Sequence, residues 1–323
     1  MPLVNFDEAV ESVADTRKIL LLGNGFSIAY SGELFAYSSL YSKAILDNNR
    51  TRLQRVFDVL NTMDFELVMN TLEGSAKISE LYDCKSECFD EMMNDIDELR
   101  DSLVEVIIDS HPEHRRVINE EQYNRTNTFL SRFDCYYTTN YDFLFYWCLF
   151  GGANPICRRV NDGFTREDDT LKWRPCANQN LFYLHGALHL YHEHTTIKKL
   201  CYSEGVLRDQ VRENIVGGRF PMVVAEGTSL QKLERIESNK YLSYAYSSLC
   251  RASGVIFIHG HSLSDNDDHI WNAISANRDI SELYVGLYGD ENSNGNLAIK
   301  DKARRIAMDR NVIFYASQSA QLW

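Results

Sequence analysis

Four short apolar runs in this sequence each end abruptly in residues that can do chemistry. The runs Lys18–Leu22, Cys135–Thr139, Leu181–Leu184 and Gly254–His259 are followed by glycines, amides, carboxylates or histidines. In a parallel sheet the carboxyl ends of the strands meet at one edge, and ligands bind there. The joint occurrence of the four endings therefore predicts a single functional site.

The first ending is Gly23-Asn24-Gly25-Phe26-Ser27, which follows directly after Leu22. Two glycines between a strand and a helix let backbone N–H groups approach a phosphate closely, and a helix N-terminus adds partial positive charge. The full dinucleotide fingerprint is absent, because Ile28 stands where its third glycine belongs. A plain tight turn remains an alternative interpretation of this segment.

The second and third endings supply an amide, a carboxylate and an imidazole. Asn140-Tyr141-Asp142 follows the second run, and His185-Gly186 follows the third. His185 is a candidate general base because imidazole titrates near neutral pH. The alternatives are turn chemistry for the first segment and a buried, fully bonded imidazole for the second. His192 and His194 lack partners at metal-ligand spacing, so we expect no metal.

The fourth ending is the polar segment His259-Gly260-His261-Ser262-Leu263, which continues to Asp265 and His269. A glycine next to a hydroxyl can accept a ribose or a phosphate, and carboxylates can bind ribose hydroxyls. We therefore expect Gly260, Ser262 and Asp265 to contribute to a cofactor site.

The elements that must position these endings follow an α/β pattern. Further strand-like runs occur at Pro221–Ala225, Leu283–Leu287 and Asn311–Tyr315, and helical stretches separate most of the runs. Several runs are apolar on successive residues, which is typical of a parallel sheet covered on both faces. We expect one Rossmann-like domain over residues 1–323, with a mostly parallel sheet and helices on both of its faces.

A helical insertion is predicted after the first strand, over about residues 30–132. Apolar residues recur every three or four positions from Phe89 to Ile107, with acidic residues between them. The insertion is placed to cap the carboxyl edge of the sheet. Asp64 and Glu66 can reach the site from it, although a solvated helix surface is the favoured interpretation. Residues 158–179 are predicted to form a polar loop.

Composition and charge exclude several classes of protein. Of the 323 residues, 44% are hydrophobic and 24% charged, which is ordinary for a globular protein and excludes a disordered chain. The net charge of −13 repels polyanions, so we expect no direct binding of nucleic acid. No apolar run approaches the roughly 20 residues that span a bilayer, so we expect no membrane helix.

The N-terminus and the cysteines indicate the compartment. The segment Met1–Arg17 is acidic where a secretory signal is basic and apolar, so we expect a cytoplasmic protein. The eight cysteines include no Cys-x-x-Cys pair. A zinc ribbon is therefore not expected, and buried free thiols are.

Taken in order, the four endings resemble the sirtuin-like NAD-consuming domains, especially the bacterial anti-phage defence branch. Gly23-Asn24-Gly25-Phe26-Ser27 looks like that family's first phosphate loop, and Thr138-Thr139-Asn140-Tyr141-Asp142 looks like its Thr-x-Asn-hydrophobic-Asp motif. Leu184-His185-Gly186 looks like the catalytic His-Gly, and Gly260-His261-Ser262-Leu263 resembles the later Gly-x-Ser segment. The resemblance extends over about residues 18–290. The two Cys-x-x-Cys pairs of the protein-deacylating members are absent, as in the defence branch.

The resemblance implies hydrolysis of NAD to nicotinamide and ADP-ribose, with no metal. Asn140 would orient a water or a ribose hydroxyl, and His185 would act as the base. The remaining residues would bind the substrate: Gly23, Asn24, Gly25, Phe26, Ser27, Tyr141, Asp142, Gly260, Ser262 and Asp265.

The same resemblance implies partners and leaves alternatives open. It points to a homo-oligomer, and to a separate sensor or a HerA-type hexameric P-loop ATPase chain, because this sequence contains no P-loop of its own. The alternatives are a module that senses NAD or ADP-ribose without cleaving it, and a zinc-free deacylase or ADP-ribosyltransferase.

Overall fold

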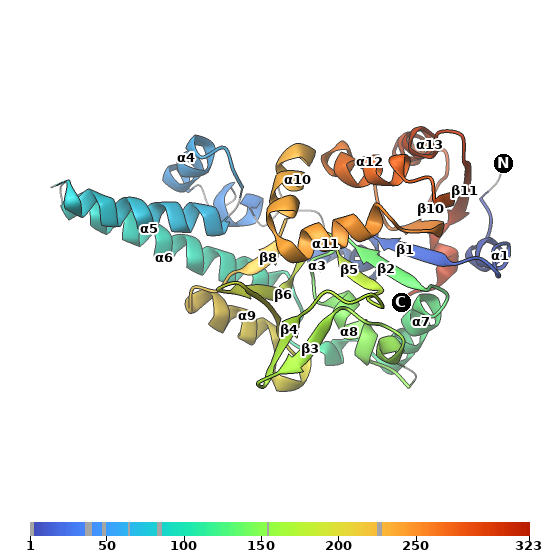
Figure 1. The fold of residues 1–323 in the computed structure, drawn as a ribbon, viewed down its shortest axis with the longest axis horizontal. Coiled ribbons are helices and arrows are strands. Elements are labelled where there is room, and N and C mark those ends of the chain that lie inside the picture. Colours follow the sequence, from blue (N-terminus) through green and yellow to red (C-terminus); the bar gives the residue numbers. More distant parts are fainter. Residues whose placement is uncertain are drawn as a thin grey trace.

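Figure 1 shows the computed structural model, which describes residues 3–35, 41–46, 50–63, 65–82, 86–153, 155–224 and 228–323. A six-stranded parallel sheet forms its centre, and a second, five-stranded antiparallel sheet is built mostly from the segment that follows β5. The expected α/β fold with a Rossmann-like sheet is confirmed.

The central sheet has the spatial order β11 (Asn311–Ala316), β10 (Ile280–Leu287), β9 (Gly254–His259), β1 (Lys18–Leu22), β2 (Cys135–Thr138), β5 (Leu181–Tyr183). The second sheet has the order β3 (Phe164–Glu167), β4 (Thr170–Trp173), β7 (Thr196–Lys199), β6 (Gly186–Glu193), β8 (Pro221–Val223). The α-helices are α1 (Phe6–Glu11), α2 (Gly25–Tyr30), α3 (Gly32–Phe35), α4 (Thr51–Val59), α5 (Phe65–Leu81), α6 (Ser86–Asp109), α7 (Glu120–Leu130), α8 (Leu144–Phe150), α9 (Leu207–Val216), α10 (Ser229–Ser238), α11 (Lys240–Leu249), α12 (Asp268–Ala276) and α13 (Asn294–Ala307). The shorter helical turns are η1 (Ser42–Leu46), η2 (Arg115–Val117), η3 (Ile156–Arg158), η4 (Tyr202–Glu204), η5 (Asp265–Asp267) and η6 (Ser317–Ala320).

The order of the central strands reverses between β1 and β9. From β1 the chain moves outward to β2 and β5, then returns to β9 on the other side and continues to β10 and β11. Leu22 lies opposite both Thr138 and His259, so β1, β2 and β9 end at the same level. In an open α/β sheet, the crevice beyond such a reversal is where ligands bind.

Successive residues of the central strands face opposite layers of the core. Leu20 and Phe257 pack in the cluster that contains α1, α7 and α8. Leu21 and Ile258 pack in the cluster that contains α11, α12 and α13. Because side chains alternate along a strand, a parallel strand covered on both faces must be apolar throughout. The continuous apolar runs in the sequence have this cause.

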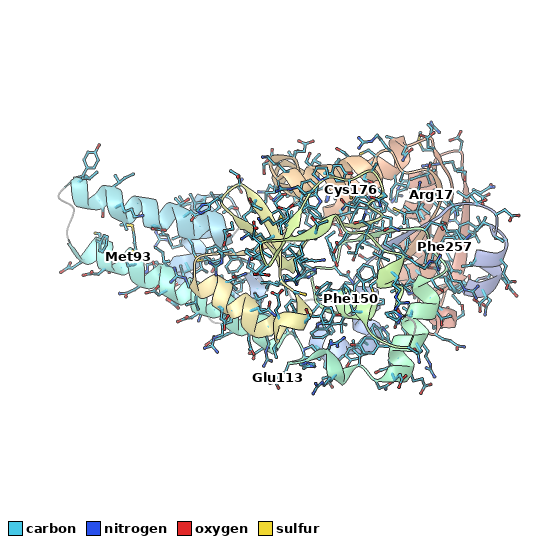
Figure 2. All side chains as sticks on the ribbon, turned by 60° about the horizontal axis from the view of Figure 1, so that its bottom comes forward. Arg17, Met93, Glu113, Phe150, Cys176 and Phe257 are labelled. Atoms are coloured by element: carbon cyan, nitrogen blue, oxygen red, sulfur yellow. The ribbon has the colours of Figure 1, made fainter. Side chains whose placement is uncertain are left out.

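Helices make up most of the described part of the chain between β1 and β2, as the sequence predicts. The longest two, α5 and α6, pack along each other as a hairpin that projects from the body of the molecule (Figure 1). Figure 2 shows Met93 on this projecting hairpin and Phe257 inside the body. Leu99 and Leu103 of α6 are buried at its base. The insertion lies on the side toward which the carboxyl ends of the strands point (Figure 1).

The second sheet was not predicted. The prediction of a polar loop over residues 158–179 is wrong, because β3 and β4 pair there with Phe164 opposite Trp173. The buried Trp173 packs against Tyr241 at 5.4 Å, which anchors this otherwise polar hairpin. The run that begins at Pro221 pairs antiparallel with β6 in this sheet, not in the central one.

The expectation for the cysteines holds in part. Among the described cysteines all thiols are free, and Cys135, Cys148 and Cys201 are buried. Cys88 and Cys250 are exposed, against the prediction. Within the described ranges, no helix combines the length and the apolar character needed to cross a bilayer.

Candidate active site

The loops that follow β1, β2, β5 and β9 meet at the carboxyl edge of the central sheet. The Asn140 side chain, after β2, donates from Nδ2 to the carbonyl oxygen of Gly23, after β1, at 3.1 Å. The His185 ring, after β5, lies 3.7 Å from the carboxylate of Asp267, in the segment after β9. The predicted convergence of the four strand ends is confirmed.

The glycines after β1 and β9 bring two backbone segments into direct contact. The N–H of Gly25 donates to the carbonyl oxygen of Gly260 at 2.7 Å. A Cβ atom on Gly25 would lie 2.6 Å from the Cα of Gly260, and one on Gly260 would lie 2.8 Å from the backbone nitrogen of Phe26. Gly260 also has a φ of +69°, which side chains rarely adopt. Glycine is therefore required for this contact at the reversal of strand order.

This contact changes the role expected of the first loop. The N–H of Gly25 is bonded to Gly260, and the N–H of Phe26 donates to the carbonyl oxygen of Gly23 at 3.1 Å, so neither is open to a phosphate as the loops lie. The Phe26 ring is fully buried and packs against Trp323 at 4.9 Å. The Asn24 side chain donates to the carbonyl oxygen of Phe35 in the insertion.

Ser27, Asn140 and Asp142 form a buried hydrogen-bond network. The Ser27 hydroxyl donates to Oδ2 of Asp142 at 2.5 Å and accepts from Nδ2 of Asn140 at 3.3 Å. Oδ1 of Asp142 accepts from the N–H of Leu144 at 2.8 Å, where α8 begins. The structure thus brings Ser27 of the first ending together with Asn140 and Asp142 of the second.

Asn140 carries the one polar atom of this network without a partner. Among the described residues, no group hydrogen-bonds its buried Oδ1. Because Nδ2 is held by Gly23 and Ser27, the direction of this oxygen is fixed. An unsatisfied buried acceptor costs about 1–3 kcal/mol. Such an atom is a candidate to receive a hydrogen bond from a bound water or ligand hydroxyl.

Asp142 and Tyr141 occupy different environments. Burial raises the pKa of Asp142 from 3.8 to about 6, although the hydrogen bonds from Ser27 and Leu144 act in the opposite direction. The carboxylate is therefore mostly ionised at pH 7. Tyr141 is half-buried, and its carbonyl oxygen accepts from the N–H of Leu188, which ties this loop to β6.

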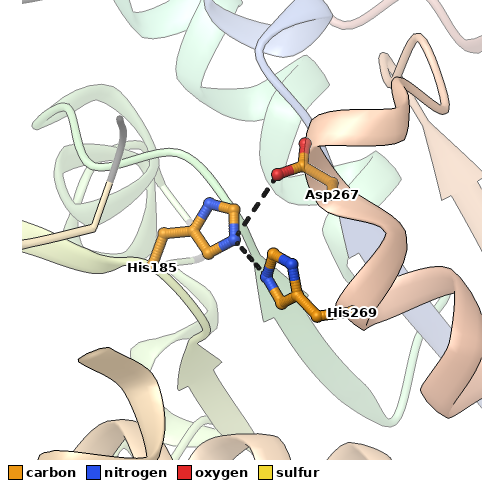
Figure 3. A group of neighbouring side chains, drawn as sticks. All are labelled: His185, Asp267 and His269. Carbon is orange, nitrogen blue, oxygen red and sulfur yellow. Dashed lines mark hydrogen bonds and ion pairs between the residues drawn. The ribbon is translucent and has the colours of Figure 1, made fainter. Parts of the chain in front are cut away.

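His185 is positioned by the sharp turn between β5 and β6. Gly186 has a φ of +74°, and a Cβ atom there would lie 1.8 Å from the carbonyl oxygen of Met222, so only glycine fits. The His185 side chain is buried, and its Nε2 lies 3.0 Å from Nε2 of His269 and 3.7 Å from Oδ1 of Asp267 (Figure 3).

Asp267 is the charged centre of this histidine cluster. Its Oδ1 accepts from the buried ammonium of Lys232 at 2.8 Å, and its Oδ2 lies 3.6 Å from Nε2 of His261. Burial alone would raise the pKa of Asp267, but His185, His261 and Lys232 together lower it to about 2. The carboxylate is therefore ionised at pH 7.

The histidines around Asp267 are neutral at pH 7. Burial is the main cause: it lowers the pKa of His261 and His269 to about 4 and that of His185 well below 6.5. The N–H of Leu263 donates to Nδ1 of His261, so the hydrogen of that ring is on Nε2, facing Asp267. We infer the same for His185, because its Nε2 also faces the carboxylate. Its Nδ1 is then the basic atom.

The four loops lie within the part of the chain that a protein-family model covers. Residues 20–323 match the model described as a domain of unknown function, DUF4917. The chain belongs to the DUF4917 family. No curated protein matches it. The family description names no activity, so the resemblance of this DUF4917 chain to sirtuin-like domains stays a prediction.

Three residues of the DUF4917 site have metal-binding atoms close together. The candidate ligand atoms of His185, Asp267 and His269 lie within 4.8 Å of one another. The ammonium of Lys232, however, is already hydrogen-bonded to Asp267 and compensates its charge. A metal ion on this carboxylate would lie close to the positive charge of the lysine, which is unfavourable. The cluster therefore fits an ion pair with histidine neighbours better than a metal site.

Two residues expected in the cofactor site lie on the surface of this DUF4917 chain. The Asp265 side chain is 86% exposed and pairs with Lys302 of α13 at 2.6 Å. Ser262 is exposed as well. Asp64 lies outside the described residues, as does the side chain of Glu66.

Sequence reasoning missed several residues that the site contains. Asp267 and His269 belong to the same polar segment as Asp265, so the segment was noted, whereas Asp267 was not chosen from it. Ser229, whose hydroxyl lies 3.1 Å from Nδ1 of His269, and Lys232 come from α10 and carry no local signal. Their role depends on the packing of α10 against η5 and α12.

Proposed function

We propose that this chain hydrolyses the nicotinamide–ribose bond of NAD and releases nicotinamide and ADP-ribose. The proposal combines the resemblance of the four loops with their position beyond the reversal of strand order, where α/β sheets bind nucleotides. It assigns the water-binding role to Asn140 and the role of base to His185.

The unpartnered Oδ1 of Asn140 is the observation that carries the proposal. It is a fixed, buried acceptor at the carboxyl end of β2, next to the loop after β1. A water molecule or ribose hydroxyl that donates to this oxygen would satisfy it and would be oriented by it. Other buried side-chain atoms of the described residues, such as Oδ1 of Asn127, also lack a partner, and the Asn140 oxygen is distinguished from them by its position at the edge where the four strand ends meet.

The reaction makes modest demands on the protein. The nicotinamide ring is cationic in NAD, so it leaves as a neutral molecule when the bond from its nitrogen to the ribose carbon breaks. The oxygen of water then bonds to that carbon, and a proton of the water passes to Nδ1 of His185. Asp267, 3.7 Å from Nε2, stabilises the resulting imidazolium. The fixed Asn140 oxygen and the Asp142 carboxylate favour the positive charge that develops on the ribose.

We propose that this activity occurs in the cytoplasm and that it depletes NAD during anti-phage defence. The resemblance is the basis for this role, for a homo-oligomer and for control by a separate sensor or a HerA-type ATPase chain. A harmful activity of this kind needs restraint in the healthy cell, which a partner can supply.

A second candidate is a module that senses NAD or ADP-ribose. The bond from the Gly25 N–H to Gly260 favours it, because a diphosphate can reach that N–H only if the two loops separate. Ligand binding would then be converted into movement of the loop after β9.

The test is chromatography of NAD incubated with the purified chain and with two variants, Asn140→Ala and His185→Ala. We expect release of nicotinamide by the wild-type chain and at least about a hundredfold less by each variant, a typical effect of losing a general base or a positioning group. Asn292→Ala and His114→Ala are matched controls, because Asn292 is exposed and His114 only caps the turn at Arg115–Val117.

The variants separate the two candidates. Release of nicotinamide at the wild-type rate by folded His185→Ala would remove His185 from the mechanism. Binding of NAD without any cleavage by the wild-type chain would favour the sensor.

A further inference from the structure

The histidine cluster contains a chain of contacts that leads from the buried His185 to the first residue of α10. Nε2 of His185 lies 3.0 Å from Nε2 of His269, which is buried as well (Figure 3). On the far side of that second ring, Nδ1 of His269 lies 3.1 Å from the hydroxyl of Ser229. Both contacts are within hydrogen-bond distance, so the hydrogen on one ring determines where the hydrogen on the other must be.

The contact between the two rings holds a single hydrogen. Both rings are neutral at pH 7, because burial lowers the pKa of His269 to about 4 and that of His185 well below 6.5. A neutral imidazole carries one hydrogen, so one ring donates and the other accepts. If His185 donates from Nε2, its Nδ1 has a lone pair that can take up a proton. If His269 donates instead, the hydrogen of His185 is on Nδ1, where a base must have none.

Asp267 and Ser229 favour the arrangement in which His185 donates. Oδ1 of Asp267 lies 3.7 Å from Nε2 of His185, so the carboxylate attracts a hydrogen on that nitrogen and repels a lone pair. The carboxylate affects the pKa of His185 more strongly than the nearby Lys232 ammonium does. In this arrangement Nδ1 of His269 carries its hydrogen and donates to the Ser229 oxygen. That oxygen is held beside the ring, because it also accepts from the backbone N–H of His269 at 2.7 Å.

We propose that His269 and Ser229 are positioning residues that hold the hydrogen of His185 on Nε2 and so leave Nδ1 as the base. His269 accepts from Nε2, as the carboxylate does in a Ser-His-Asp triad. Ser229 accepts from His269 and fixes the form of that ring which can accept. The effect on NAD cleavage rests on the proposed function, whereas the hydrogen positions can be measured without a substrate.

One helix, α10, fixes both groups that face Nε2 of His185. Its first residue, Ser229, contacts His269 through two hydrogen-bond distances. One turn later, the buried Lys232 donates to Asp267 at 2.8 Å. The form of the base therefore depends on the packing of α10 against η5 and α12, not on the loop that carries His185.

The first test is NMR of ¹⁵N-labelled histidine rings in the purified full-length chain at pH 7 without NAD. The ¹⁵N shifts of a neutral ring show which nitrogen carries the hydrogen, and the spectra of His185→Gln and His269→Gln assign the signals. We expect the hydrogens on Nε2 of His185 and Nδ1 of His269, with a scalar coupling between the two Nε2 nuclei. A hydrogen on Nδ1 of His185 would overturn the proposal, whether or not the chain cleaves NAD.

The second test compares two variants of His269 in nicotinamide release. The amide oxygen of His269→Gln can accept from Nε2, whereas the side chain of His269→Leu cannot. Both residues favour helices, and the backbone bonds from His269 to Ser229 and Tyr246 do not need its side chain. We expect kcat to stay within about threefold of wild type in His269→Gln and to fall at least about tenfold in His269→Leu, with KM unchanged.

The control for the loss of a buried imidazole is His111→Leu. His111 is also buried, and its pKa is also lowered to about 4, but it lies beyond the end of α6. This variant should keep the wild-type kcat. Equal kcat values for folded His269→Gln and His269→Leu would overturn the role of His269.

The hydroxyl of Ser229 is tested in the same way. Ser229→Ala removes the acceptor and should lower kcat at least about threefold, whereas Ser229→Thr keeps a hydroxyl and should restore it. Ser238→Ala, at the exposed far end of α10, is the matched control. If the wild-type chain releases no nicotinamide, the proposed function fails, and the NMR spectra still decide the positions of the hydrogens.

Discussion

At the scale of single residues, the candidate site contains two groups of different character. Ser27, Asn140 and Asp142 form a hydrogen-bond network whose one free acceptor is the Asn140 oxygen. The histidine cluster around Asp267 is an ion pair surrounded by neutral imidazoles. The first group suits the orientation of a hydroxyl or water, and the second suits the uptake of a proton.

The pH dependence of nicotinamide release tests the role of His185. A base must be unprotonated, and burial holds the pKa of His185 well below 6.5. We therefore expect the rate to stay nearly level from pH 8 to 7 and to fall to about half near pH 6, where Asp142 is half protonated. A fall centred at or above pH 6.5 would instead indicate an imidazole of ordinary pKa as the base.

Removal of metal tests the interpretation of the cluster. Because Lys232 already compensates Asp267, dialysis of the wild-type chain against a chelator should leave both its thermal stability and nicotinamide release unchanged. Loss of either, with recovery on adding zinc or manganese, would show that His185, Asp267 and His269 bind a metal.

The sequence predicted which residues lie at the site better than it predicted which residues they contact. Asn140, Asp142 and His185 could be predicted because each follows an apolar strand directly, and residues at strand ends must lie at the edge of the sheet. Lys232 could not be predicted, because nothing near it in the sequence shows that α10 packs against η5. The orientation of the Phe26 ring could not be predicted, because its position beside two glycines says nothing about which way the ring points.

At the scale of elements, the contact between the loops after β1 and β9 holds the site together. Gly25 and Gly260 meet backbone to backbone there, and a larger residue has no room. The continuous apolar runs made the six central strands predictable. The β3–β4 hairpin was not, because it is mostly polar and is held by the long-range contact of Trp173 with Tyr241.

The variant Gly260→Ala measures this loop contact. Gly218, whose φ is +76°, has nothing within 4 Å of the place where its Cβ would be, so Gly218→Ala reports the cost of the backbone conformation alone, about 1 kcal/mol. Gly260→Ala should lower the free energy of unfolding by about 1–3 kcal/mol more, because its Cβ meets the backbone of α2. Chemical denaturation of both variants gives the comparison. Equal losses would mean that the two loops are not in contact in solution.

At the scale of the whole molecule, buried histidines make the fold sensitive to acid. Burial lowers the pKa of His111, His259, His261 and His269 from 6.5 to about 4. In the unfolded chain each takes up a proton near pH 6.5, whereas in the folded chain each stays neutral. Their contribution to stability is therefore complete above pH 6.5 and is lost as the pH falls to 4.

The pH dependence of unfolding can be measured by urea titration. Asp142 acts in the opposite direction between pH 3.8 and 6, because its folded pKa is raised to about 6. With these four imidazoles and the buried His185 and His189 against one carboxyl, unfolding near pH 5 should take up several protons, and each proton adds about 1.4 kcal/mol per pH unit to the slope. A free energy of unfolding that is the same at pH 6.5 and pH 5 would contradict the burial of these rings.

The organisation of the whole chain was largely readable from the sequence. The apolar runs and their spacing predicted a Rossmann-like, mostly parallel sheet and the helical insertion, since both follow from apolar periodicity. The second sheet could not be predicted, because it depends on how β6 and β8 pair beside a turn that only Gly186 permits.

The most direct test of the central claim is proton NMR of NAD during incubation with the purified wild-type chain. We expect nicotinamide and ADP-ribose to appear in equal amounts as NAD disappears, and no such change with Asn140→Ala. Intact NAD in a sample where line broadening shows that it binds, or cleavage that continues unchanged in Asn140→Ala, would contradict the account.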